Sequence, residues 1–323
     1  MKSAILYALG SAALFGASTP LAKWLLSSEH KNLSPLLFAG LLYLGSGLGL
    51  FMVRCIRDKG FKKPNLTNSE WPWLMSAIAF GGVLAPIALV LGLTLTSGST
   101  ASLLLNLEAV LTAVLAWLVF KEHTDKRMLL GMLAIVLGSV LLTTTHHAHS
   151  TENGYSGPAL IALACLCWAI DNNLTRKVAS SDAVFISSIK GLIAGIVNTA
   201  IAFVMVQNLS LPNWTTTLAS MALGFAGYGI SLVMFVLALR GLGAARAGAY
   251  FSTAPFVGAA LSLLVLDEST TLLFWVASAF MAFGVWLHLT EHHDHEHEHV
   301  SLGQAPIRHS HPHYPDIDHQ HAH

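Results

Sequence analysis

Apolar residues occur along this chain in long, nearly uninterrupted runs. A helix that spans a bilayer needs about 20 largely apolar residues. Ten segments meet that requirement: residues 3–26, 34–56, 72–95, 99–120, 127–145, 156–178, 183–207, 214–239, 244–266 and 270–290. Two uncharged runs are too long for one helix, and residues with turn propensity divide them at Thr96–Thr100 and Gln207–Asn213. The pattern predicts an all-α integral membrane protein with ten transmembrane helices.

The composition excludes most soluble classes. Of the 323 residues, 54% are hydrophobic and only 11% are charged, whereas a soluble domain carries about 25% charged residues. The formal net charge is zero and the basic residues are scattered, which argues against nucleic-acid binding. The lipid bilayer is therefore the expected partner, and no nucleic acid is expected.

The basic residues predict the orientation. They gather in the even-numbered connections between spans: Arg54, Arg57, Lys59, Lys62, Lys63, Lys121, Lys126, Arg127, Arg176, Lys177, Arg240 and Arg246. The odd-numbered connections hold only Lys31. Because short cytoplasmic loops are enriched in Lys and Arg, both termini are predicted to be cytoplasmic, in a multi-pass protein of the cell (inner) membrane.

The two halves of the chain are similar to each other. Residues 106–142 align with residues 252–288 at a constant offset, and Phe15–Lys23 parallels Trp168–Arg176. Each half holds five spans, an odd number, so the second half enters the membrane upside down relative to the first. The sequence thus predicts two inverted five-helix repeats, an arrangement typical of secondary transporters.

Over residues 3–290 the sequence resembles the EamA-type branch of the drug/metabolite transporter superfamily. The first helix of each repeat carries a (Phe/Trp)-(Gly/Ala)-x(5–6)-(Lys/Arg) pattern, at Phe15–Lys23 and Trp168–Arg176, and the second repeat has Pro255 in its fourth helix. The first repeat departs from the pattern, with Glu108 and Ala109 at that place. Further shared features are an acidic residue after each fourth helix and glycines in each fifth helix: Glu122, Glu268, Gly131, Gly138 and Gly284.

The resemblance implies the domain organisation and the function. The chain is expected to have four parts: a first EamA-like repeat (1–145), an outer connection (146–155), a second EamA-like repeat (156–290) and a disordered His-rich cytoplasmic tail (291–323). The implied function is secondary active transport, with export of a small organic metabolite by alternating access and with no required cofactor. A homodimer is left open.

Asp171, Asn172 and Asn173 interrupt the apolar sixth helix. Lys190 of the seventh helix is expected at the same depth as Asp171, because the two helices are consecutive and antiparallel. One interpretation is a structural ion pair that neutralises two buried charges. The other is that these side chains bind substrate or a coupling proton, since ionisable residues within spans usually face a bundle interior.

Glu108 is the other acidic residue deep in an apolar segment, with no polar partner one turn away except Thr112. It either couples transport to protons or only specifies helix packing. Tyr250 supplies a hydroxyl to the ninth helix, either for packing or for the pathway. Pro20, Pro86 and Pro255 are expected to kink their helices.

The tail from residue 292 holds eleven of the 17 histidines, mostly spaced His-x-His. The candidate metal ligands are His293, His295, His297, His299, His309, His311 and His313. Such tracts bind Zn, Ni, Co or Cu ions, which leaves two alternatives open: a divalent-metal transporter or metal-regulated carrier, and a membrane-anchored metal buffer. No span contains a Gly-x-Ser-x-Gly or His-Glu-x-x-His centre, so no enzyme is expected.

Truncation after residue 290 separates these alternatives. If the helices carry a metabolite, the truncated protein exports solute at the wild-type rate and loses retention on an immobilised-nickel column. Solute export and metal tolerance of cells that express each form are the measurements. Loss of metal tolerance with no other change would contradict the metabolite carrier.

Overall fold

The structure is a computed structural model that describes residues 2–27, 33–60, 66–120, 126–147, 155–178, 181–242, 250–289, 294–299 and 307–312. Before residue 290, the described residues are mainly helical. The elements of the first half are α1 (Lys2–Leu25), α2 (Pro35–Asp58), α3 (Trp71–Ala77), η2 (Ile78–Leu84), α4 (Ala85–Leu95), α5 (Gly98–Leu104), α6 (Asn106–Phe120) and α7 (Lys126–His147). Those of the second half are α8 (Ser156–Thr175), η3 (Arg176–Val178), α9 (Ala183–Met205), α10 (Trp214–Gly224), η4 (Phe225–Ile230), α11 (Ser231–Leu242), α13 (Ala254–Val265) and α14 (Leu272–Leu289).

Among the described residues, eight helical segments are long and apolar enough to cross a membrane, and two shorter apolar helices, Ala254–Val265 and Leu272–Leu287, follow them. Of the ninth predicted span, the structure describes residues 250–266. Residues 243–249 lie outside the described part, and a turn at Ser252–Thr253 precedes α13. Pro255 lies in the first turn of α13, where a missing N–H costs no helical hydrogen bond. It thus helps to begin a helix, whereas Pro20 lies inside α1.

The third and eighth spans each contain a turn of π-helix. η2 lies between α3 and α4, and η4 lies between α10 and α11. A π-turn adds a residue to one helical turn and leaves carbonyl groups without their usual partners. Both turns are rich in glycine, with Gly81 and Gly82 in the first and Gly227 and Gly229 in the second.

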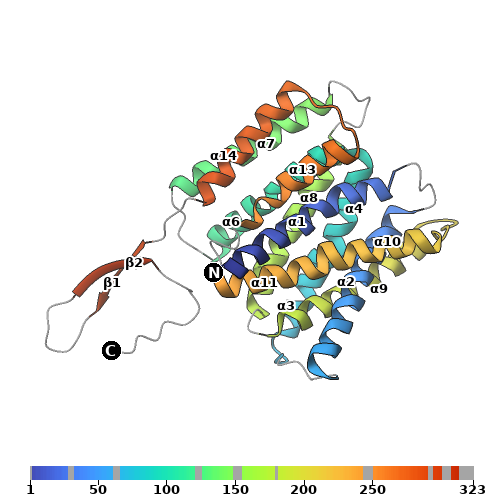
Figure 1. Cartoon of the computed structure of the whole chain (residues 1–323), viewed down its shortest axis with the longest axis horizontal. Helices are drawn as coiled ribbons and strands as arrows, with labels where there is room; N and C mark the ends of the chain where they lie inside the picture. Colours follow the sequence, from blue (N-terminus) through green and yellow to red (C-terminus); the bar gives the residue numbers. More distant parts are fainter. Residues whose placement is uncertain are drawn as a thin grey trace.

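Two helix pairs rest on glycine contacts. α2 packs along α9, where a Cβ atom at Gly47 or Gly191 would overlap the backbone of the opposite helix. α7 and α14 lie side by side at one edge of the molecule (Figure 1). There Gly138 contacts Met281, and Gly284 contacts the carbonyl of Gly131. The glycines noted in the fifth helices therefore serve close helix contact.

Glu268 joins the two halves of the chain. Its carboxylate accepts hydrogen bonds from the backbone N–H groups of Gly98 at 2.6 Å and Ser99 at 2.9 Å. These groups begin α5, where helical N–H groups have no partner within the helix and the dipole favours an anion. The acidic residue after the fourth helix of the second half thus caps the fourth helix of the first half. Glu122, its counterpart, lies outside the described residues.

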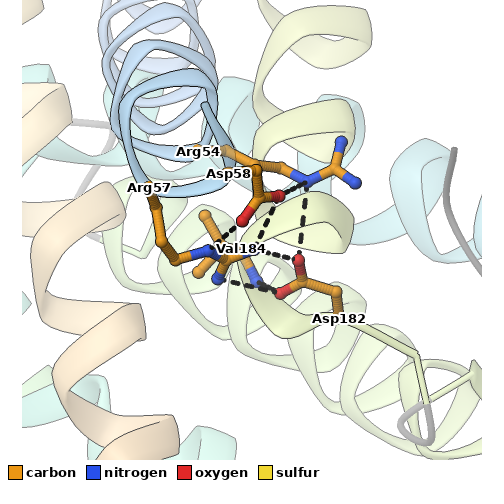
Figure 2. A network of polar contacts seen from close by, with 5 residues as sticks. All are labelled: Arg54, Arg57, Asp58, Asp182 and Val184. Carbon is orange, nitrogen blue, oxygen red and sulfur yellow. Dashed lines mark hydrogen bonds and ion pairs between the residues drawn. The ribbon is translucent and has the colours of Figure 1, made fainter. Parts of the chain in front are cut away.

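An ionic network ties the C-terminal end of α2 to the start of α9 (Figure 2). The Arg57 guanidinium lies 2.5 Å from Asp182 and 2.7 Å from Asp58. Nε of the buried Arg54 lies 3.5 Å from Asp182, and its guanidinium stacks over the Phe185 ring at 4.8 Å. Asp182 also accepts a hydrogen bond from the first turn of α9. One carboxylate therefore both caps α9 and binds α2.

Beyond the helices, β1 (Asp294–His299) pairs antiparallel with β2 (Ile307–Pro312), with Asp294 opposite Pro312. The disorder that the composition predicts for the tail stays a prediction. An alternating sequence has the two-residue period of a strand. The remaining tail residues, and the side chains of all the candidate metal ligands, lie outside the described part.

We expect Asp182→Asn to lower stability in a pH-dependent manner. Burial alone would raise the pKa of Asp182, but hydrogen bonds from Arg57 and the Val184 amide and the charges of Arg57 and Arg54 hold it below its ordinary value of 3.8. Asparagine still caps a helix, so the variant removes mainly the ion pairs, which are worth about 1 kcal/mol.

Because the folded-state pKa is lowered, this stabilisation is fully present above pH 3.8 and is lost as the pH falls through the folded value. Thermal unfolding in detergent should therefore show a deficit for Asp182→Asn at neutral pH that shrinks below that pH. Asp267→Asn, in an exposed turn, is the matched control. A deficit that does not vary with pH would contradict the assignment.

Candidate functional site

The charge pair expected from the sequence is present and confirmed. Lys190 Nζ of α9 donates to both carboxylate oxygens of Asp171 on α8, at 2.5 and 2.7 Å. The Thr175 hydroxyl donates to the same carboxylate at 2.8 Å and accepts from Lys190 at 3.2 Å. The side chains of Lys190 and Asp171 are only 15% and 10% exposed. Each buried charge is thus neutralised and hydrogen-bonded, as a low-dielectric environment requires.

The adjoining backbone of η2 is irregular because of Pro86. Proline has no N–H, so the carbonyls one turn before it, those of Gly81 and Gly82, lack a helical donor at the junction of η2 and α4. In a membrane such groups need another partner within the protein. Asn198 of α9 supplies one, since its side-chain amide donates to the Gly82 carbonyl at 2.9 Å.

Two aromatic side chains satisfy the Gly81 carbonyl. The Tyr43 hydroxyl of α2 donates to it at 2.9 Å, and the indole Nε1–H of Trp168 on α8 donates at 3.1 Å. Gly81 is also in contact with the Asp171 carboxylate, which a Cβ atom at this position would overlap. The π-turn therefore holds α2 and α8 together beside the ion pair.

Glu108 finds its partner on another helix. The side-chain amide of Asn172 donates to Glu108 at 2.9 Å and lies 3.4 Å from the Thr112 hydroxyl. The buried Asn173 donates to the backbone carbonyls of Thr112 at 3.3 Å and Ala169 at 2.9 Å. The consecutive polar residues on α8 thus have different roles: Asn173 ties α8 to α6, and Asn172 faces the Glu108 carboxyl.

Aromatic rings from four segments of the chain adjoin this polar centre. The Phe15 ring of α1 lies 5.9 Å from that of Tyr228 in η4 and 5.3 Å from that of Phe251. Tyr43 and Tyr228 lie 5.7 Å apart. Trp168 on α8 and Leu107, next to Glu108 on α6, pack in the same cluster as these rings. The rings and the carboxyl groups therefore belong to one region between the helices.

The predicted site residues do not all converge. Asp171, Asn172, Asn173, Glu108 and Lys190 lie together on α6, α8 and α9, as described above. Tyr250 packs instead against Ala4, Ala8 and Ala238, near the start of α1 and away from the ion pair. Tyr250 belongs to the polar end of the ninth predicted span. The sequence did not determine where that end lies relative to the sixth span.

Comparison with known proteins decides the family. The EamA-like transporter family matches the chain twice, over residues 2–144 and 155–290. The chain belongs to the EamA-like transporter family. This membership, together with the apolar helices, makes the chain a multi-pass membrane transporter and not an enzyme.

The EamA-like transporter has relatives at moderate identity. An uncharacterized transporter of Methanothermobacter thermautotrophicus is 28% identical over 288 residues, which cover 84% of this chain and 82% of the relative. The uncharacterized transporter YyaM of Bacillus subtilis is 24% identical over 68% of this chain and 74% of its own. A solved crystal structure shares the fold, with a TM-score of 0.65 at 18% identity, and covers 89% of this chain and 98% of that one.

The sequence alone did not single out several residues of the site. In the sequence, each of them is an isolated polar residue in an apolar helix: Tyr43, Asn198 and Thr175. Only tertiary contacts join them to the polar site around Asp171. Gly81 carried a usable signal, because a glycine pair four to five residues before a proline marks carbonyls that other side chains must satisfy.

Gly81→Ala should destabilise the EamA-like transporter. The added methyl group overlaps the Asp171 carboxylate, and overpacking of this kind costs about 1–3 kcal/mol. The melting temperature in detergent should fall, and Ala79→Val, at an exposed position of the same π-turn, should leave it nearly unchanged. If Gly81→Ala and Ala79→Val lower the melting temperature equally, the contact with Asp171 does not restrict the side chain at position 81.

Proposed function

We propose that this EamA-like transporter is a secondary active exporter of a small organic metabolite. The observation that carries the proposal is the concentration of ionisable side chains inside an apolar bundle: the Asp171–Lys190 pair and Glu108 beside Asn172. Ionisable residues at membrane depth usually belong to substrate or ion pathways. Export and the organic nature of the cargo rest on the family resemblance.

The proposed mechanism is alternating access by two inverted five-helix repeats. The two separate family matches support this arrangement. The π-turns support it as well, because they begin at Ile78 and Phe225, 147 residues apart (225 − 78). The helix breaks at Leu105 and Ser252 have the same separation (252 − 105 = 147).

A pair of equivalent contacts supports the same symmetry. When Phe15–Lys23 is aligned with Trp168–Arg176, Ser18 corresponds to Asp171. Gly81 of η2 contacts Asp171, and Gly227 of η4 contacts Ser18. Each half thus presents a glycine of its π-turn to the same position of the other half's first helix. One copy carries the charge and the other a neutral hydroxyl, so the proposed pathway is chemically asymmetric.

In this mechanism the ion pair is the part that responds to substrate. A charged group of the substrate competes with Lys190 for Asp171, or with Asp171 for Lys190, and the π-turn beside the pair allows α8 and the third span to shift. Glu108 is the proposed carrier of the coupling proton, because its carboxyl is bonded to a neutral amide. The metal-carrier and metal-buffer alternatives depend on tail side chains outside the described residues and stay predictions.

Substitutions of the ion pair distinguish a pathway from a structural role. Asp171→Asn and Lys190→Gln each leave one buried charge without its partner, which costs about 3–5 kcal/mol. The double variant removes both charges and should regain stability. If the pair belongs to the pathway, the double variant still fails to export.

The measurement compares metabolites in the medium of cells that overexpress each form with those of a deletion strain, alongside the amount of folded protein in the membrane. Thr94→Val, which removes an exposed hydroxyl bonded only within α4, is the control. Wild-type export by the stable double variant would reject the pathway role and leave the pair as charge balance.

A further inference from the structure

α2 and α9 contact each other through equivalent faces. Their first residues are 148 positions apart (183 − 35), and in this register Gly47 corresponds to Gly195 and Leu44 to Leu192. A Cβ atom at Gly47 would overlap Leu192, and one at Gly195 would overlap Leu44. The contacts are thus reciprocal, so each position at one end of the pair has a counterpart at the other end.

Large side chains close one end of the pair. The guanidinium of the buried Arg54 lies over the Phe185 ring at 4.8 Å from its centroid. Beside it, Arg57 lies 2.5 Å from Asp182, the N-cap residue of α9 (Figure 2). These side chains occupy the space between the last turn of α2 and the first turn of α9.

The other end of the pair has smaller, uncharged residues at the corresponding positions. In the same register Ala202 corresponds to Arg54, and Ser34, the N-cap residue of α2, corresponds to Asp182. The Asp182 side chain accepts a hydrogen bond from its own helix, whereas the Ser34 side chain makes no capping hydrogen bond. This end therefore lacks the side chains that close the first end.

A groove lies at this second end. Its volume is about 530 Å³, which is within the range of ligand-binding sites. The start of α2, the end of α4 and the segment after α9 form its walls. Its lining is apolar apart from two hydroxyl groups and includes Ser34, Leu36, Leu91, Val206, Leu209 and Ser210.

The groove continues the lipid-facing surface of the transporter. Phe203, Val204 and Met205, in the last turn of α9, are exposed apolar side chains, which in a membrane-spanning helix face lipid. Val206, the next residue, lines the groove. Trp214, at the start of the next span, is exposed, as aromatic residues at the edge of the bilayer are. The groove therefore opens into hydrocarbon near the level of the lipid headgroups.

We propose that this groove binds one acyl chain of a bilayer phospholipid. An apolar groove does not hold ordered water, and a void beside it forfeits dispersion contacts. The chain supplies those contacts at the end of the α2–α9 pair where the stacked Arg54 has no counterpart. The hydroxyls of Ser34 and Ser210 lie where the ester groups of the lipid need donors. The bound lipid thus stabilises the helix pair, whatever solute the transporter carries.

Native mass spectrometry of the purified full-length protein in detergent tests the proposal. The delipidated protein receives palmitoyl-oleoyl phosphatidylethanolamine or phosphatidylglycerol, and the retained lipid is counted. Because the lining is uncharged, the two headgroups should bind with affinities within about threefold of each other. Either lipid should raise the melting temperature by about 2 °C or more.

Two variants fill the groove from opposite walls. Leu209→Trp and Leu91→Trp each place a ring where the acyl chain would lie, and each should lower lipid retention at least about fivefold by steric exclusion. Leu133→Trp, at an exposed leucine of α7, is the matched control and should retain lipid as wild type does. Melting temperatures without added lipid check that each variant is folded.

Unchanged retention in both folded groove variants would overturn the lipid site. A strong preference for phosphatidylglycerol that persists in them would do the same, since it indicates a headgroup site elsewhere. So would a wild-type dimer that the groove variants convert to a monomer at unchanged lipid retention, because the groove would then be an interface between copies.

A measurement on the wild-type protein covers the case in which a groove variant does not fold. A phospholipid with a photoreactive acyl chain should label the start of α2, the end of α4 and the segment after α9, and unlabelled phospholipid should compete for those segments. Labelling there that resists competition as much as labelling of α7 does would contradict the proposal. None of these results depends on export, so the transport function is tested separately.

Discussion

The interior of this protein depends on the neutralisation of Asp171 by Lys190. A charge inside an apolar bundle is costly unless it is paired and hydrogen-bonded, and here both conditions are met by Lys190 and Thr175. The pair fixes the depth of α8 relative to α9. Beside the pair, η2 approaches α8 so closely that position 81 has room only for a glycine.

A second constraint arises from the backbone itself. Inside a membrane every carbonyl needs a partner within the protein, and Pro86 removes the donor that would serve the π-turn before it. Tyr43, Trp168 and Asn198 take over that role from three different helices. The same irregular turn thus joins the third span to α2, α8 and α9, and places aromatic rings beside the carboxyl groups.

The helices themselves are held by close approach more than by specific polar bonds. Lipid tails are as apolar as the side chains, so helix association in a membrane depends on packing of small residues. The α2–α9 and α7–α14 pairs follow this principle, with glycines against the opposite backbone. The ionic network of Arg54, Arg57, Asp58 and Asp182 adds a polar bond at one end of the first pair, outside the apolar region.

Much of the architecture could be predicted from the sequence. The long apolar runs and the positions of the charged residues both result from the free-energy cost of placing polar and charged groups in lipid. The eight longer spans and the pairing of Asp171 with Lys190 follow from that cost, whereas the family follows from the motifs repeated in the two halves. The turn at Ser252–Thr253 was not predicted, because it leaves the hydropathy of the run unchanged.

The partners of Glu108 and of the π-turn could not be predicted, because they lie on helices far apart in sequence and each reads locally as one polar residue in an apolar segment. The sequence by itself determined that costly groups lie within the membrane. Only the tertiary structure decided which of them are neutralised by each other and which, like Glu108, are bonded to an uncharged amide on another helix. The physical reason is that burial cost is a property of a residue and its segment, whereas compensation is a property of the contacts between segments.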